Sequence, residues 1–124
     1  MLKGKVVLVV DDEEDLRELI SEELKLAECR VLTAKNGHEA LKIIAENKID
    51  LVITDLRMNN GDGKFIIEGV ERLEKHRPKI VVLTGYMGEE DADIVKKAHA
   101  VLHKPIKWQN LINIVEQVIA KKKL

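Results

Sequence analysis

Five short apolar runs divide the chain, and they constrain its fold more strongly than any other feature. The runs cover residues 6–10, 30–34, 50–54, 79–83 and 100–103, of which the second and the fifth are the weakest. They are rich in β-branched residues, and their apolar residues are continuous rather than alternating with polar ones. Such strands are apolar on both faces, which is what a parallel sheet covered by helices requires.

Segments with helical periodicity follow each of these runs. Their apolar residues recur every three or four positions, which places them on one face of a helix. The expected buried stripes are Leu16, Leu19, Ile20 and Leu24; Ala40, Leu41, Ile44 and Ala45; Ile66, Ile67, Val70 and Leu73; and Trp108, Leu111, Ile112, Val115, Val118 and Ile119. The segment 89–98 has the weakest stripe, so we expect a shallowly anchored and mobile helix there.

Strand and helix therefore alternate five times, a pattern typical of right-handed βαβ crossovers. The sequence predicts an α/β fold in which a doubly wound parallel sheet of five strands carries five helices. A chain of 124 residues has the size of one domain. We expect residues 1–124 to form that single domain, with no output domain. The lysine run at 121–123 is interpreted as positive charge that suits a helix C-terminus.

Composition and charge narrow the classes of function. Aromatic residues make up only 2% of the chain, too few for an aromatic cage or a base-stacking surface. The formal net charge is -1, so no excess positive charge can hold a phosphate backbone, and nucleic acid is disfavoured as a partner. The sequence shows no signal peptide or membrane-length apolar segment, and its single cysteine, Cys29, suits a reducing compartment. We expect a cytoplasmic protein.

Polar residues follow four of the five predicted strands. Asp11 and Asp12 follow the first strand, Asp55 the third, Thr84 the fourth and Lys104 the fifth. The carboxyl ends of parallel strands meet at one edge of the sheet, where open α/β sheets bind their ligands. We therefore expect three carboxylates, one hydroxyl and one ammonium group to converge at that edge.

This set of groups has a coherent chemical use. Neighbouring carboxylates repel one another, and a hard divalent cation such as Mg²⁺ relieves that repulsion while also binding phosphate oxygens. Lys104 can neutralise a further oxygen, and Thr84 can donate a hydrogen bond. The arrangement suits a phosphoryl group whose acceptor is one of the carboxylates. Asp55 is the best acceptor because it stands alone at its strand end, whereas Asp11 and Asp12 form a pair suited to the metal.

Each of these residues also has an ordinary structural role open to it. Asp11 and Asp12 could cap a helix, Asp55 could begin a turn, and Lys104 could be a solvated lysine. Taken singly, these roles have as much support as the functional ones. Their joint occurrence at four strand ends of one sheet favours the functional interpretation.

Five separated strings resemble the response-regulator receiver domain of two-component signalling, the CheY-like family. The strings are Val9-Val10-Asp11-Asp12-Glu13, Ile53-Thr54-Asp55-Leu56-Arg57-Met58, Asp62-Gly63, Leu83-Thr84-Gly85 and Lys104-Pro105. They cover essentially the whole chain, in the family's order and near its spacing. One string alone would be weak, but the agreement of all five is specific. The resemblance implies a flavodoxin-like fold.

The resemblance also implies an acceptor and a metal site. Asp55 would accept a phosphoryl group from a phosphohistidine on a histidine kinase or a histidine phosphotransfer protein. Asp12 and Asp55, with the backbone carbonyl of Arg57, would bind Mg²⁺ or Mn²⁺ directly, and Asp11 would act mainly through a water molecule. The side chains of Arg57 and Tyr86 would tune the lifetime of the acyl phosphate.

The remaining matched positions would form the switch. Thr84 and Lys104 would contact the phosphoryl group, Gly85 would leave room beside it, and the Lys104–Pro105 peptide bond would be cis. The family's usual aromatic residue three positions before the lysine is Val101 here. A valine disfavours a switch by ring reorientation, for which Tyr86 is a possible substitute ring.

Two further departures concern loops. The stretch 98–104 is shorter than usual for the family, so the face made by the last two strand–helix units should be reshaped. The string Asn59-Asn60-Gly61 stands where a proline is usual. Because Asn and Gly readily adopt positive φ, we expect a more flexible loop there.

These observations favour a phosphoacceptor switch that then binds a downstream protein or relays the phosphoryl group. It would phosphorylate and dephosphorylate itself, and it would not be a turnover enzyme: phosphatases with an aspartate nucleophile carry a second acid two positions later, where Arg57 stands here. The alternative is a phosphorylation-independent protein-interaction module with the same fold. We expect a monomer with no membrane or nucleic-acid partner.

Overall fold

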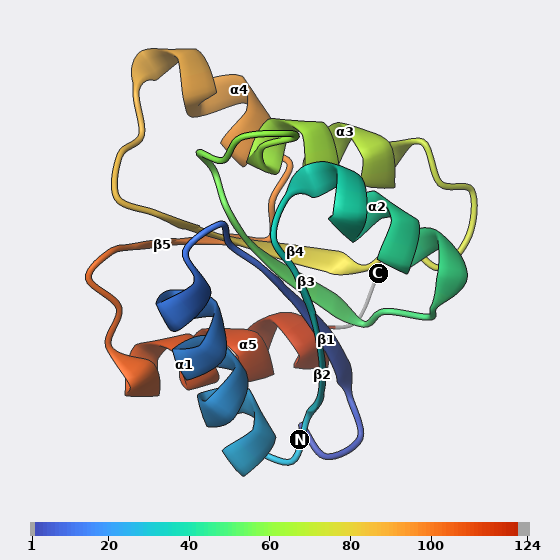
Figure 1. Cartoon of the computed structure of the whole chain (residues 1–124), viewed down its shortest axis with the longest axis vertical. Coiled ribbons are helices and arrows are strands. Elements are labelled where there is room, and N and C mark those ends of the chain that lie inside the picture. Colours follow the sequence, from blue (N-terminus) through green and yellow to red (C-terminus); the bar gives the residue numbers. More distant parts are fainter. Residues whose placement is uncertain (1, 122–124) are drawn as a thin grey trace.

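The computed structural model describes residues 2–121, which form one sheet with helices on both faces (Figure 1). Two of the C-terminal lysines, Lys122 and Lys123, lie outside the described residues. Between residues 2 and 121, no helix is both long and apolar enough to cross a membrane.

Five parallel strands form the sheet in the order β2-β1-β3-β4-β5. They are β1 (Val6–Val10), β2 (Arg30–Ala34), β3 (Leu51–Asp55), β4 (Lys79–Thr84) and β5 (Ala100–His103). Because β1 pairs with both β2 and β3, the sheet grows first in one direction and then in the other. The predicted doubly wound sheet is confirmed. Asp55 and Thr84 are the last residues of their strands rather than the first residues of the loops, so the sheet itself fixes their backbones.

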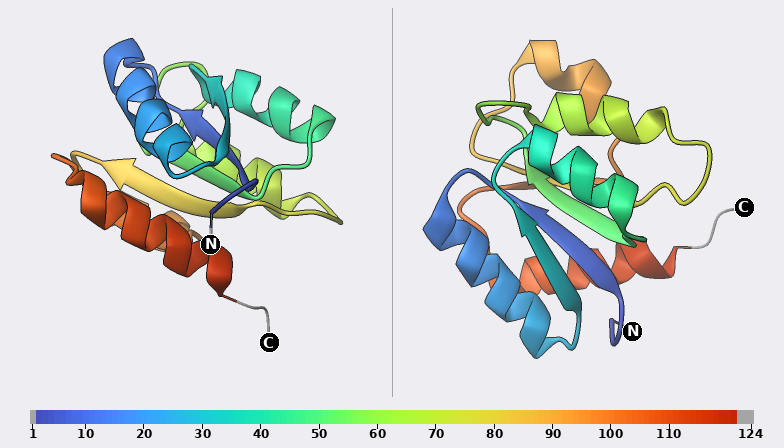
Figure 2. Two further views of the ribbon diagram at one scale, coloured as in Figure 1. Left: turned by 90° about the horizontal axis from the view of Figure 1, so that it is seen from below. Right: turned by 45° about the vertical axis from the view of Figure 1, so that its right-hand side comes forward.

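Five helices cover the two faces of the sheet. They are α1 (Glu14–Leu26), α2 (Gly37–Glu46), α3 (Gly63–Glu71), α4 (Ala92–Val95) and α5 (Trp108–Ala120), with a 3₁₀ turn, η1 (Glu89–Asp91), before α4. Helices α1 and α5 lie on one face, and α2, α3 and α4 lie on the other (Figures 1 and 2).

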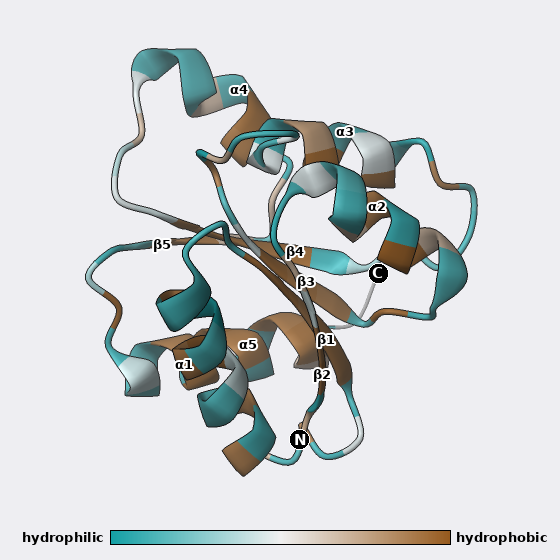
Figure 3. Cartoon of the chain, in the orientation of Figure 1, coloured by the Kyte–Doolittle hydropathy of each residue, from teal (hydrophilic) through white to brown (hydrophobic). Residues whose placement is uncertain are grey.

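Successive residues of each strand face opposite layers of the core. In β1, Val7 and Val9 pack in the layer of α1 and α5, whereas Leu8 and Val10 pack in the layer of α2 and α3. All four side chains are buried. Figure 3 shows the strands as a hydrophobic centre and most of the outer helix surface as hydrophilic. The continuous apolar runs of the sequence are therefore explained by burial on both faces.

Three expectations about helices are wrong in part. The segment 89–98 is not one helix, because η1 and α4 end at residue 95 and α4 has only four residues. Leu19 is 48% exposed, and Ala45 is exposed as well. In α1 the buried face passes through Ser21, whose hydroxyl is satisfied by the carbonyl of Arg17 at 2.7 Å, and this orientation turns Leu19 toward solvent.

The loop before α3 has the backbone that its Asn-Gly sequence predicts. Asn60 has φ 58° and Gly61 has φ 99°. The loop is nevertheless attached to the start of α2, since the N–H of Gly37 donates to the carbonyl of Gly61 at 2.7 Å. A Cβ on Gly37 would lie 2.6 Å from that carbonyl oxygen, so the close approach requires glycine.

Candidate functional site

Four predicted site residues meet at the carboxyl edge of the sheet. One carboxylate oxygen each from Asp11, Asp12 and Asp55 lies within 4.8 Å of the others. The Nζ of Lys104 donates to Oδ2 of Asp55 at 2.7 Å and lies 3.5 Å from Oδ2 of Asp11. The convergence expected from the strand ends is thus present, although Asp11 and Lys104 are 93 positions apart in the chain.

Local hydrogen bonds orient the two buried carboxylates. The N–H of Glu13 donates to Oδ1 of Asp11 at 2.9 Å, and the N–H of Arg57 donates to Oδ1 of Asp55 at 3.2 Å. Asp55 therefore does fill the turn-forming role that the sequence left open, and Asp11 makes a similar local bond without capping α1, whose N-cap is Glu13. Each of these bonds occupies only one oxygen, so the Oδ2 atom of each residue remains directed at Lys104.

Burial and neighbouring groups shift the pKa values of Asp11 and Lys104 at this edge. Burial raises the pKa of Asp11 above its usual value, and the charge of Asp55 adds to this effect, while the N–H of Glu13 and the Lys104 ammonium oppose it. Burial alone would lower the pKa of Lys104, but its hydrogen bond to Asp55 and the charge of Asp11 outweigh burial and raise that pKa. The ammonium group is therefore held in its charged form by the carboxylates.

The donor set fits a hard divalent cation. Three carboxylates face a single ammonium group, so negative charge is in excess when all are ionised. Oxygen ligands of this kind suit Mg²⁺, and Asp12 is exposed, which leaves room for coordinated water. A hollow of about 280 Å³ opens beside Asp12 and is lined by Asp12, Arg57, Met58, Asn59 and Asp62.

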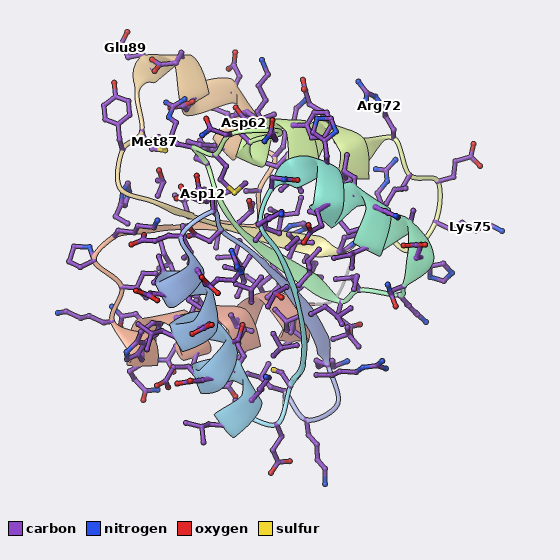
Figure 4. The ribbon with its side chains drawn as sticks, viewed as in Figure 1. Asp12, Asp62, Arg72, Lys75, Met87 and Glu89 are labelled. Atoms are coloured by element: carbon purple, nitrogen blue, oxygen red, sulfur yellow. The ribbon has the colours of Figure 1, made fainter. Side chains whose placement is uncertain are left out.

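In Figure 4, Asp12, Asp62 and Met87 lie on one side of the molecule, away from Arg72 and Lys75.

Thr84 lies at the same edge, but its hydroxyl is engaged elsewhere. The Oγ1 of Thr84 donates to the carbonyl of Tyr86 at 2.6 Å and accepts from the N–H of Tyr86 at 3.2 Å. The backbone carbonyl of Thr84 accepts from the N–H of Lys104 at 2.9 Å. The Lys104–Pro105 bond is cis, as expected, and a Cβ built on Gly85 would meet nothing within 4 Å. The hydroxyl of Thr84 is thus hydrogen-bonded within its own loop, while its backbone carbonyl is bonded to the N–H of Lys104.

Two switch positions have surroundings that the sequence did not indicate. Val101 lies in β5, opposite Val82, and packs half-buried against the core layer of α2 and α3. Tyr86 is 62% exposed, and its ring centroid is 5.4 Å from the guanidinium carbon of Arg57. The exposed ring therefore belongs to the loop after β4 and not to β5.

Sequence reasoning missed Asp91. This residue is buried, and its carboxylate forms an ion pair with the guanidinium of Arg57, which also lies 3.3 Å from Glu90. The sequence shows Asp91 inside an acidic run, a pattern usually interpreted as a solvated face. The only sequence signal was the uncompensated cation of Arg57, two positions after Asp55.

The sequence of this chain is similar to those of known signalling proteins. Residues 7–116 match the family model of the response regulator receiver domain. The transcriptional regulatory protein ZraR of Salmonella typhimurium is 32% identical over 123 residues, which are 97% of this chain and 28% of that protein. GlrR of Escherichia coli, also a transcriptional regulatory protein, is 29% identical over 91% of this chain and 26% of its own length. The chain thus spans about a quarter of the length of these relatives.

Solved structures add a fold comparison. The response regulator TrrA of Thermotoga maritima, solved in complex with Mg(2+)-BeF, has a TM-score of 0.83 and 33% identity, covering 92% of this chain and 98% of that one. The chemotaxis protein CheY4 of Vibrio cholerae has a TM-score of 0.86 and 28% identity, covering 93% and 98%. The CheY-like, flavodoxin-like fold is therefore confirmed. Strand order, acidic edge and matched sequence lead to one conclusion: this chain belongs to the family of response regulator receiver domains, the signalling domains of two-component systems.

Proposed function

We propose that this chain is a phosphoacceptor switch that receives a phosphoryl group on Asp55. The observation that carries the proposal is the position of the Asp55 carboxylate, which contacts the Lys104 ammonium and lies beside two further acids at the ligand-binding edge of the sheet. The donor would be a phosphohistidine on a histidine kinase or a histidine phosphotransfer protein. The reaction would take place in the cytoplasm.

The transfer is a substitution at phosphorus. An oxygen of the Asp55 carboxylate forms the new O–P bond as the N–P bond to the donor histidine breaks, and the departing imidazole nitrogen keeps the electron pair of that bond. Asp11, Asp12 and Asp55, with the backbone carbonyl of Arg57, would hold Mg²⁺ or Mn²⁺. When bound, the ion supplies positive charge to the phosphoryl oxygens.

Lys104 and Thr84 would bind the product. The Lys104 ammonium already contacts Oδ2 of Asp55, so a small movement brings it to a phosphoryl oxygen. The Thr84 hydroxyl would exchange its bond to the Tyr86 carbonyl for one to the phosphoryl group. Gly85 leaves open space beside that group.

The output is proposed to pass to another protein. The phosphorylated domain would change its affinity for a downstream target or relay the phosphoryl group to a histidine. We propose that residues 1–124 act as one monomeric domain without turnover chemistry and without nucleic acid or membrane as a partner.

A phosphorylation-independent interaction module is the second candidate. Two observations favour it: Val101 supplies no ring at the usual switch position, and the Thr84 hydroxyl is bound within its own loop. The presence of the full acidic edge and of Lys104 favours the phosphoacceptor.

Binding of a beryllium fluoride complex in the presence of Mg²⁺ separates the two candidates, because this complex mimics a phosphoryl group on a carboxylate. We expect calorimetry to detect binding that requires Mg²⁺ and is lost in Asp55→Asn. The matched control is Asp15→Asn, which removes an exposed acid of α1 and should bind as the unchanged protein does. No binding at millimolar Mg²⁺ would favour the interaction module.

A further inference from the structure

Arg57 connects the candidate site to a distant segment of the chain. Its backbone N–H donates to the Asp55 carboxylate at 3.2 Å, while its guanidinium reaches away to the carboxylates of Asp91 and Glu90. The ring of Tyr86 lies against the same guanidinium at 5.4 Å. One residue therefore touches the acceptor with its backbone and the segment before α4 with its side chain.

Asp91 is the centre of this attachment, which we call the Arg57 clasp (Arg57 with Asp91, Glu90 and Tyr86). Asp91 is only 6% exposed, and its Oδ2 also accepts from the N–H of Gly88 at 2.9 Å. A buried carboxylate is costly unless its charge is compensated, and Arg57 is the cation that compensates it. Removing the guanidinium would therefore disturb the whole η1 turn.

Few other contacts hold this segment. Within residues 86–98, Ile94 is the single buried apolar side chain, and α4 is one turn long. At the far end, Lys97 forms an ion pair with Glu71 at 3.1 Å, but both side chains are about half exposed. Exposed ion pairs of this kind contribute little to the free energy of folding. The position of η1 and α4 therefore depends on the clasp and on a small apolar contact made by Ile94 with the half-buried Val95 and Ala98.

We propose that the Arg57 guanidinium binds two alternative anions: Asp91 and Glu90 in the unmodified protein, and the phosphoryl group on Asp55 in the phosphorylated one. This inference rests on the proposed function. Phosphorylation adds a dianionic group with three acceptor oxygens, and guanidinium binds such groups with paired hydrogen bonds. Arg57 also lines the hollow beside Asp12, so this residue borders the edge where the phosphoryl group would lie.

The exchange has a structural consequence. When the guanidinium moves to the phosphoryl group, Asp91 is left buried without its cation, so η1 and α4 must shift to bring that carboxylate to water. Addition of the phosphoryl group thereby moves the surface around α4. This route needs no aromatic ring in β5 and is therefore compatible with Val101 at that position.

Two variants with opposite expected effects test the exchange. Asp91→Asn removes the buried anion of the clasp and leaves only the exposed Glu90 paired with the guanidinium, so by reciprocity between the two anions this variant should bind Mg²⁺-beryllium fluoride roughly fivefold more tightly. Arg57→Gln removes the guanidinium and should bind this probe roughly fivefold more weakly. The matched control, Glu71→Gln, breaks the other ion pair of this segment and should leave the affinity unchanged.

Amide hydrogen exchange of residues 88–95 supplies the second readout. Both variants should exchange faster than the unchanged protein without the probe, and adding the probe should accelerate exchange in the unchanged protein but not in Asp91→Asn. The proposal is overturned if the two variants change affinity in the same direction, or if the unchanged protein binds the probe and keeps its slow exchange. If the unchanged protein fails to bind the probe at all, the proposed function itself fails, and this inference with it.

Discussion

Helices α5 and α4 are consecutive in the chain, yet they are attached to the sheet in opposite ways. Helix α5 has 13 residues and buries Leu111, Val115 and Val118 against the strands. Helix α4 has four residues and fully buries Ile94 alone, with Val95 packed half-buried against the core, while ion pairs of Asp91 and Lys97 attach the segments on either side of it. Figure 3 shows this contrast as a largely hydrophobic α5 and a mainly hydrophilic segment leading into α4.

The contrast indicates which helix can move when the charge at Asp55 changes. Apolar burial does not depend on the charge at Asp55, so α5 should keep its place when the site is phosphorylated. An attachment made by ion pairs competes directly with a new anion. We therefore expect α4 to move and α5 to stay.

The largest expected effect comes from α5. Replacing the fully buried Leu111 by alanine should lower the free energy of unfolding by about 2–5 kcal/mol, because the change leaves a cavity in the core. Urea denaturation measures this loss. Leu19→Ala is the matched control, because Leu19 is 48% exposed and its replacement should cost less than about 0.5 kcal/mol. Equal losses in the two variants would contradict the assigned burial.

A smaller effect is expected in α4. Ile94→Ala should lower the free energy of unfolding by about 1–2 kcal/mol, since Ile94 lies at the border of the core. Its effect should be local, so amide exchange should accelerate in residues 88–98 while α5 keeps its protection. A loss as large and as global as that of Leu111→Ala would show that α4 is anchored by burial after all.

The smallest effect concerns pH and the start of β5. The Nδ1 of His99 accepts from the N–H of Ile80 at 3.0 Å, which requires an unprotonated nitrogen. Partial removal of the imidazole from water, and then the charges of Lys79 and Lys121, lower the pKa of His99 below its usual value of 6.5. The folded pKa is thus below the unfolded one, so this contribution is complete above pH 6.5 and is lost as pH falls through the folded pKa.

Urea unfolding across this pH range gives the measurement. Stability of the unchanged protein should fall as pH drops below 6.5, whereas His99→Gln, whose amide oxygen can still accept from Ile80, should lack that part of the slope. Identical slopes in the two proteins would contradict the assigned role of His99.

Much of the fold could be predicted from sequence, because its strands are buried on both faces and are therefore marked by continuous apolar runs. The acidic edge could be predicted for a related reason: parallel strands bring their carboxyl ends together, so Asp11 and Asp55 must meet. The Arg57–Asp91 pair could not be predicted, since it joins residues 34 positions apart through an irregular loop. A charged residue in such a loop has the same sequence pattern whether it is solvated or paired.

The length of helix α4 and the direction of the Thr84 hydroxyl also could not be predicted from the sequence. The apolar pattern of 89–98 is compatible with a helix, but too little apolar surface is available there to stabilise more than one turn. The Thr84 hydroxyl can donate either to the Tyr86 carbonyl or to a group at the site. No residue pattern in the sequence indicates which acceptor it uses.

Reductive trapping of the acyl phosphate identifies which aspartate is phosphorylated. The protein is incubated with acetyl phosphate with and without Mg²⁺, treated with borohydride, which reduces an aspartyl phosphate to homoserine, and sequenced by mass spectrometry. We predict homoserine at position 55 only in the samples that contain Mg²⁺. Homoserine at position 11 or 12 instead, or no modified residue in any sample, would contradict the account.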